Sequence, residues 1–173
     1  MKSAFHQITF TPTVLAAQEK YNGRSAALSD RELKPTPLGA EEAAFIAERD
    51  SFYLATVSES GWPYIQHRGG TVGFLRVLDD HTIGFADFGG NRQLITVGNL
   101  AANDRVALFL MDYTRRERMK LLGHANVLDG SEDPALAARL AVTGYRARIE
   151  RMFLIKVIAF DWNCPQHITP RVC

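Results

Sequence analysis

The sequence predicts a mainly β protein, an antiparallel barrel of about six strands with helices at its periphery, on three observations. Between residues 51 and 160, apolar residues alternate with polar ones or form short runs rich in β-branched and aromatic side chains, which is typical of strands. Turn signals such as Ser60-Gly61 and Asp79-Asp80-His81 separate consecutive runs, so neighbouring strands are joined as hairpins. Helical spacing occurs near the chain ends and in one short insertion between the fourth and fifth strands. Such an arrangement favours an antiparallel sheet that closes or nearly closes on itself.

Residues 1–38 are expected to form an N-terminal arm, and residues 39–173 the barrel domain with its C-terminal tail, as a single domain overall. Within the arm, Thr11 is placed to cap a short helix, Pro12 to occupy its first position and Gly23 to end it.

The barrel domain begins with an amphipathic helix over 39–50, whose first turn is acidic and whose apolar residues share one face. Strand-like runs then follow at 51–59, 62–70, 71–80, 81–88, 104–113, 116–130 and 152–160. Helical spacing is predicted at 91–103, at 133–144 and over a few residues from Tyr145 onward.

The composition is that of an ordinary globular chain. With 173 residues, 46% of them hydrophobic, it is long enough for one domain with a substantial core. The 20 basic and 19 acidic residues leave a net charge of +1, which argues against broad nucleic-acid binding. No apolar run reaches the ~20 residues that a membrane-spanning helix needs, and the N-terminus lacks a signal-peptide core. We therefore expect a cytoplasmic protein with neither a membrane nor a nucleic acid as partner.

The stretch DFGGNRQ, residues 87–93, has the features of an anion site. Gly89 and Gly90 allow a positive φ and a close backbone approach, and Asn91 is placed to cap the following helix. Free N–H groups at a helix start bind phosphate, and Arg92 on the first turn adds a charge-assisted donor. The alternative is a plain glycine turn, capped by Asn91, with a solvated arginine.

A second candidate is YIQHRGG, residues 64–70, where strand alternation puts Gln66 and Arg68 on one side and His67 on the other. A buried arginine without a partner would cost several kcal/mol, so an anion is expected near Arg68. The alternative is an arginine at the barrel rim that pairs with an acid such as Asp87.

A third cluster lies at the start of a long strand, where Arg116, Arg118 and Lys120 share one face. Like charges on one face repel, which favours either a shared anion or a solvated, charge-protected edge.

The tail at 160–171 carries Trp162 and His167 in an irregular, proline-bearing segment. These side chains are suited either to covering a planar ring or to closing the barrel end. Cys164 and His167 have a C-x-x-H spacing, but no second ligand pair lies nearby, so we predict no metal site. Cys164 and Cys173 leave one disulfide arithmetically possible.

Together the segments FYLATVSESGWPYIQHRGG, TIGFADFGGNRQLITVGNLAANDRVALFLMD and RMKLLGHANVL resemble the FMN-binding split barrel of the pyridoxamine 5'-phosphate oxidase-related superfamily. The resemblance covers roughly residues 40 to 130 and rests on several weak motifs in the right order. It implies an antiparallel six-stranded split β-barrel that binds FMN.

By position, the resemblance assigns the flavin phosphate to Arg68, Asn91, Arg92 and Gln93. Asn91 stands where the family has Ser, and Gln93 stands where it has Lys, which removes one positive charge. Arg118 and, less directly, Lys120 are the candidates to replace that charge.

The flavin ring would lie along the strand that carries Gln66, His67, Arg68 and Gly69, next to Phe85-Ala86-Asp87. The resemblance also implies a homodimer with FMN at the interface, so that Trp162 and His167 are candidates to reach the partner's site.

The function that this implies is a flavin-dependent oxidoreductase acting on an unknown small substrate or electron donor, with His67 as the candidate proton donor. The alternatives are a non-catalytic protein that binds or carries a flavin, haem or a deazaflavin, and a structural dimerisation barrel. The tail reads HITPR and lacks the R-L-x-P-type substrate segment of true pyridoxamine-phosphate oxidases, so the substrate stays unassigned.

Overall fold

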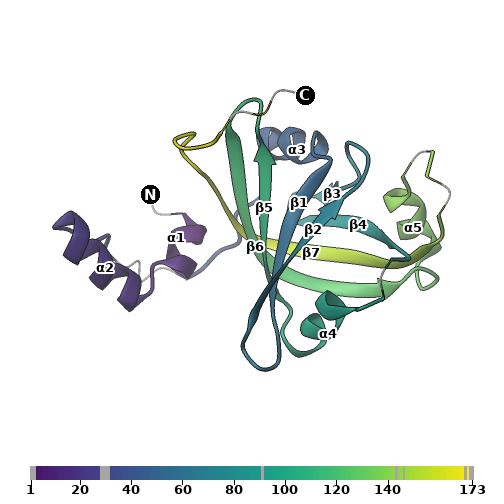
Figure 1. Cartoon of the computed structure of the whole chain (residues 1–173), viewed down its shortest axis with the longest axis horizontal. Coiled ribbons are helices and arrows are strands. Elements are labelled where there is room, and N and C mark those ends of the chain that lie inside the picture. Colours follow the sequence, from purple (N-terminus) through teal and green to yellow (C-terminus); the bar gives the residue numbers. More distant parts are fainter. Residues whose placement is uncertain are drawn as a thin grey trace.

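The computed structural model describes residues 3–27, 32–90, 92–142, 144–145, 147–169 and 171, and its centre is one curved antiparallel sheet (Figure 1). Seven strands form the sheet in the order β2-β1-β5-β6-β7-β4-β3. The strands are β1 (Ser51–Val57), β2 (Pro63–Gly69), β3 (Arg76–Asp79), β4 (Thr82–Phe88), β5 (Arg105–Asp112), β6 (Glu117–Asp129) and β7 (Ile149–Trp162).

Five helices surround this sheet in the part of the chain described. They are α1 (Ala4–Thr9), α2 (Pro12–Asn22), α3 (Ala40–Ala47), α4 (Ile95–Ala102) and α5 (Pro134–Leu140). In Figure 1, α3 lies at one end of the curved sheet, α4 lies at the opposite end, and α5 lies beside the ends of β4 and β7. None of these helices has the length and apolarity needed to cross a bilayer.

The predicted fold class is confirmed. The described strand pairs are antiparallel, and most of them are joined as hairpins, as the turn signals indicate. Helix α4 is the short helix inserted between the fourth and fifth strands. The edge strands β2 and β3 stand at opposite ends of the strand order, so the described part of the barrel is split rather than closed. The part of the chain described contains seven strands, one for each of the strand-like runs, against the expected count of about six. The run at 71–80 gives only the four-residue strand β3, which pairs with β4.

The core lies inside the curve of the sheet, because strand alternation turns every second side chain inward. In β5, for example, Val106, Leu108 and Leu110 are buried while their neighbours are partly or fully exposed. The rings of Phe85 and Phe153 stack in the core with their centroids 4.8 Å apart.

The sheet bends where the β6–β7 register shifts between Leu122 and Gly123. A Cβ added at Gly123 would lie 2.5 Å from the carbonyl oxygen of Lys156, so only glycine fits this close approach. The bulge therefore depends on that glycine.

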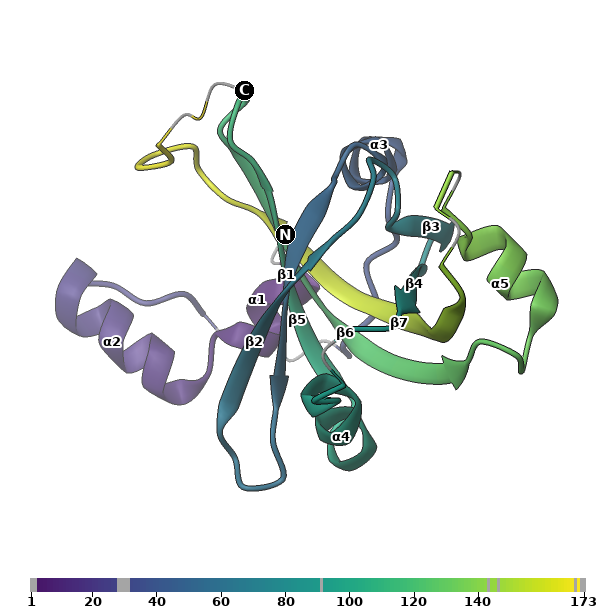
Figure 2. The ribbon, with the colours of Figure 1, turned by 45° about the vertical axis from the view of Figure 1, so that its right-hand side comes forward.

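The N-terminal arm contains the predicted helix α2. Thr11 caps it by accepting a hydrogen bond from the Val14 N–H, Pro12 is its first residue, and Gly23 ends it with φ 67°. The arm also contains α1, which sequence patterning did not reveal and whose Phe5 packs against Ala159 of β7. No residue of α2 is buried, and Figure 2 shows this helix extending away from the sheet.

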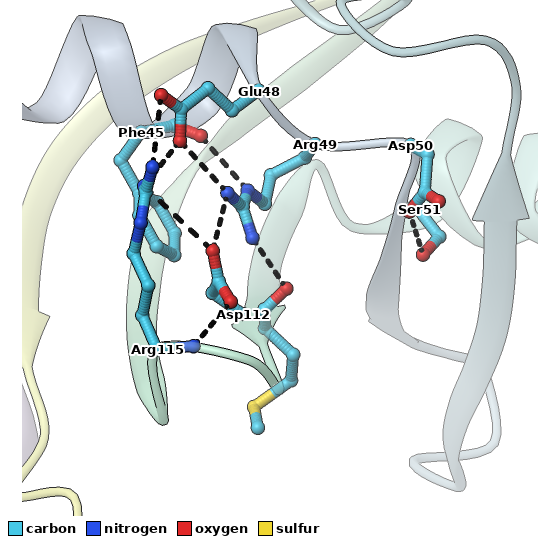
Figure 3. A network of polar contacts seen from close by, with 8 residues as sticks. Phe45, Glu48, Arg49, Asp50, Ser51, Asp112 and Arg115 are labelled. Atoms are coloured by element: carbon cyan, nitrogen blue, oxygen red, sulfur yellow. Dashed lines mark hydrogen bonds and ion pairs between the residues drawn. The ribbon is translucent and has the colours of Figure 1, made fainter. Parts of the chain in front are cut away.

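A buried arginine fixes α3 to the turn between β5 and β6 (Figure 3). Arg49, whose side chain is only 8% exposed, donates to the carbonyl oxygens of Phe45 and Met111 at 3.0 and 2.9 Å. Its guanidinium also donates to Asp112 at 2.9 Å, and Arg115 in the turn donates to Asp112 through its backbone N–H. This network accounts for a charged side chain inside the fold without any ligand.

One helix prediction is wrong. The short helix expected from Tyr145 onward is absent from the described residues there, and β7 begins at Ile149. Sheet pairing with β4 and β6 overrides the local helical spacing.

Candidate functional site

A cavity of about 310 Å³ lies between β2, the end of β4 and the start of α4. It brings together many of the residues singled out in the sequence, namely Gln66, Arg68, Asp87, Arg92 and Gln93. The remaining lining residues are Tyr64, Phe88, Gly90, Leu94, Ile95, Thr96, Val97 and Arg151.

The alternation of β2 directs Gln66 and Arg68 into this cavity. Gln66 and Arg68 are half-buried, whereas His67 is exposed on the other face, as the strand pattern predicts. Gln66 is held in place by Thr96 of α4, whose hydroxyl donates to the Gln66 Oε1 at 2.8 Å.

Arg68 is paired with an acid, which is the alternative that the sequence left open. Its Nη1 donates to Asp87 Oδ1 at 2.8 Å, and Arg151 Nε donates to Asp87 Oδ2 at 2.8 Å. Asp87 and Arg151 are direct cross-strand partners in the β4–β7 ladder. The side chains of Arg68, Asp87 and Arg151 are 15, 13 and 19% exposed. Asp87, on β4, therefore links Arg68 of β2 to Arg151 of β7 at the cavity wall.

The ion pairs continue outward from this triad. Glu150 lies 3.0 Å from Arg151, and Arg92 lies 4.0 Å from Glu150 with 82% of its side chain exposed. The result is a line of alternating charges, Arg68–Asp87–Arg151–Glu150–Arg92, with one positive charge in excess. Arg92 is the member of this line with the weakest pairing.

The helix start differs from the prediction. α4 begins at Ile95 rather than near residue 91, so Arg92 and Gln93 precede the helix instead of lying on its first turn. The N-cap position is Leu94, which makes no side-chain cap bond, and the predicted cap Asn91 lies outside the described residues. The Leu94 side chain thus offers no cap to the first N–H groups of α4, and the residues that carry these groups line the cavity.

The positive φ values of this loop occur at other residues than the predicted Gly89 and Gly90. Arg92 and Leu94 adopt positive φ values of 57° and 54°, whereas neither Gly89 nor Gly90 does. A non-glycine residue in this region costs on the order of 1–3 kcal/mol, and such residues are concentrated at functional sites. Gly89 instead permits a close approach, because an added Cβ would lie 2.9 Å from Glu150 Oε1.

A second cavity, of about 240 Å³, adjoins the first and shares the Arg68–Asp87 pair as a wall. It is lined mainly by rings and backbone, and it contains the other predicted ring contacts, His67, Gly69, Phe85 and Ala86. Phe74, Phe88 and Tyr145 complete it, and the ring centroids of Phe88 and Tyr145 are 4.7 Å apart.

Three predicted site residues line neither cavity. Trp162 packs edge-on against Phe45 and donates to Glu42 Oε1 at 3.0 Å, inside its own chain. Arg118 donates to the Cys164 carbonyl oxygen at 3.4 Å, and His167 is exposed in the tail.

The other predicted features of the tail and of β6 have simple surroundings. Lys120 pairs with Asp161 at 3.0 Å, so the cations of β6 do not share one anion. Cys164 is exposed, and Cys173 lies outside the described residues. Among the residues described, no group of three His, Cys, Asp or Glu side chains could hold a metal.

Sequence reasoning missed two residues of the site, Arg151 and Thr96. Arg151 lies just before the strand predicted at 152–160, so its register opposite Asp87 does not follow from the local pattern. Thr96 stands in an apolar helical stretch, where a hydroxyl gives no separate signal until the helix is seen against β2.

The fold and the site together define a split-barrel protein with a cationic pocket at a helix start. The sequence model of the pyridoxamine 5'-phosphate oxidase family matches residues 38–161, so the chain belongs to that family. No curated protein matches the chain.

Several solved structures share the fold. HupZ of Group A Streptococcus has a TM-score of 0.58 and 18% identity, over 78% of this chain and 99% of that one. A Lactobacillus delbrueckii protein named after pyridoxamine 5'-phosphate oxidase has a TM-score of 0.56 and 18% identity, over 72 and 93% of the two chains. An FMN-binding protein of Syntrophomonas wolfei has a TM-score of 0.50 and 17% identity, over 72 and 85%.

Proposed function

We propose that this protein binds FMN in the cavity between β2 and α4 and acts as a flavin-dependent oxidoreductase on a small substrate. The observation that carries the proposal is that Arg68, Arg92 and the start of α4 line one cavity in a chain of this family. A structural neighbour that is named an FMN-binding protein has the same fold, which supports the same ligand here.

The residues present fit a phosphate group. The first N–H groups of α4, which Leu94 does not cap, and the positive end of the α4 dipole attract an anion, and Arg92 adds an exposed guanidinium beside them. The Nε of Arg68 is buried and has no hydrogen-bond partner among the described residues, so one donor at the cavity wall is unused. The cavity volume of about 310 Å³ is at the lower end of the range for ligand sites.

The ring of the flavin would extend toward the second cavity, past the backbone of β4. Phe88 is shared by both cavities, and Gln66 offers its side-chain amide to ring edges. The strand residues 85–87 offer backbone groups at the same wall.

A homodimer would complete the site from outside. The outer face of β1, β2 and β5 is apolar, with Tyr53, Ile65 and Phe109 around a shallow cavity of about 180 Å³. Ile65 is 63% exposed there, and exposed apolar patches mark interaction surfaces. Part of this face is on the same strand as Gln66 and Arg68, so a partner docked on it would lie close to the proposed cofactor.

A bound FMN supplies the chemistry, because it accepts a hydride or electrons from a small reduced molecule. The chain's own residues hold the phosphate, orient the ring and restrict water through the rings of Phe85 and Phe88. His67, on the wall of the second cavity, is the candidate to donate or accept a proton beside the substrate.

The test is direct. The purified protein should carry a yellow chromophore or quench FMN fluorescence at micromolar concentrations, and native mass spectrometry should identify FMN. A colourless protein that takes up no FMN would contradict the proposal. Turnover with NADH or NADPH and common electron acceptors would establish the oxidoreductase activity.

A second candidate is a protein that binds a flavin, a deazaflavin or haem without turnover. It is favoured by Gln93 in place of the family's Lys and by Asp87, which accepts hydrogen bonds from two guanidinium groups of the cavity and offsets one of their two charges. Titration with each of these cofactors, followed by the turnover assay, distinguishes the two functions.

A further inference from the structure

The cavity proposed to bind phosphate has a carboxylate in its lining, that of Asp87, where only cationic side chains would be expected. Both of its carboxylate oxygens are engaged, one by Arg68 and one by Arg151, each at 2.8 Å. All three side chains line the cavity between β2 and α4. Because these bonds are charge-assisted and mostly shielded from water, the carboxylate is held firmly.

The Asp87 carboxylate also weakens the attraction of the cavity for a phosphate group. Of the three guanidinium groups on its wall, two face Asp87, and only Arg92 is held by a long contact of 4.0 Å to Glu150. A phosphate dianion that enters the cavity therefore meets the loosely paired guanidinium of Arg92, the unused Nε of Arg68 and, close behind them, the negative charge of Asp87. Like charges in a partly buried site repel strongly.

We propose that Asp87 is a specificity-determining residue that acts as a built-in counter-anion and lowers the preference of the site for a phosphorylated ligand. This inference rests on the proposed flavin site. It predicts that the protein distinguishes FMN from uncharged riboflavin by about 10- to 100-fold, the contribution of a single charge-assisted hydrogen bond. A site with several free arginines would distinguish them by on the order of a thousandfold or more.

The experiment measures the dissociation constants of FMN and riboflavin by fluorescence quenching for the full chain and for Asp87→Asn. Asparagine has the same shape and no charge; its oxygen can still accept from one of the two arginines, while its NH₂ group replaces the second acceptor. The FMN preference should rise about tenfold, since one like charge leaves a partly buried site. Asp87→Ser serves as a second neutral variant if the first does not fold.

The matched control is Asp104→Asn. It makes the same change in net charge at an exposed carboxylate that pairs with His124 on β6 and lines none of the cavity. Its ratio of FMN to riboflavin affinity should equal that of the unmodified protein.

The outcomes separate the two proposals. If the unmodified protein binds neither flavin, the proposed function fails and the role of Asp87 fails with it. If it binds FMN, two results overturn the role of Asp87 alone. One is an initial preference of a thousandfold or more. The other is an unchanged preference in the neutral variants, and if both affinities fall equally, Asp87 only ties β2 to β7.

Discussion

Thr96 of α4 donates its hydroxyl proton to Gln66 Oε1 of β2 over 2.8 Å, and this bond joins the helix start to the strand across the candidate cavity. Thr96 is only 2% exposed, so water does not compete for the bond. Because the oxygen of Gln66 is the acceptor, its NH₂ group remains as the donor that the cavity can use. One buried hydroxyl thus orients a side chain on a different element.

The first prediction concerns this bond. Thr96→Val keeps the side-chain shape but removes the donor, so Gln66 loses its fixed orientation. FMN and riboflavin should both bind more weakly by about 1 kcal/mol, the usual net value of a hydrogen bond. Fluorescence titration measures both affinities. Thr96→Ser, which keeps the hydroxyl, is the control, and unchanged affinities in the valine variant would show that Gln66 does not touch the ligand.

The second prediction concerns Arg92, which is 82% exposed and the most loosely paired cation of the site. Arg92→Ala should weaken FMN binding by about 1.5–3 kcal/mol, the value of a charge-assisted hydrogen bond, and leave riboflavin binding unchanged. Isothermal titration with the two ligands measures the difference. Arg24→Ala, on the exposed N-terminal arm, makes the same charge change and should have no effect. An equal loss for both ligands would place the phosphate elsewhere.

The sequence was sufficient for the fold because its signals are local. The Thr11 cap, the Gly23 stop and the strand alternation each act within a few residues, and the structure confirms all of them. The convergence of Gln66, Arg68 and Arg92 on one cavity also followed from local patterns combined with a family resemblance.

The partners within the site were harder to predict, because they depend on strand register. The pairing of β4 with β7 places Arg151 beside the Asp87 carboxylate, and the contact of Arg68 with Asp87 joins strands that are not neighbours in the sheet. The start of α4 was misplaced because Leu94 adopts a left-handed conformation that no propensity rule assigns to leucine.

The third prediction concerns the N-terminal arm. Phe5 of α1 is 7% exposed, and the Lys120 ammonium lies 4.5 Å from its ring centroid. Phe5→Ala should lower the free energy of unfolding by roughly 3 kcal/mol through lost burial. Urea denaturation measures this change. Val14→Ala on the exposed helix α2 is the comparison and should change it by less than about 0.5 kcal/mol. Equal effects would mean that α1 does not dock on the sheet in solution.

The fourth prediction concerns pH and the network of Figure 3. Burial raises the pKa of the Asp112 carboxyl, but hydrogen bonds from the Arg115 backbone N–H and the Arg49 guanidinium outweigh it, so its pKa lies below 3.8. A carboxyl whose pKa is lower in the folded than in the unfolded state stabilises the fold above the unfolded pKa. That stabilisation is lost as the pH falls through the folded pKa.

Asp112→Asn should therefore lower the free energy of unfolding at pH 7 by about 2 kcal/mol, because the buried Arg49 loses the nearer and less exposed of its two carboxylate partners and keeps only Glu48, at 3.2 Å. The gap between this variant and the unmodified protein should narrow steadily as the pH drops below about 4, where the unfolded chain begins to bind the proton. Urea denaturation at a series of pH values measures the gap, with Asp104→Asn as the control at an exposed carboxylate. A gap that stays constant or widens in acid would show that Asp112 contributes through packing and not through its charge.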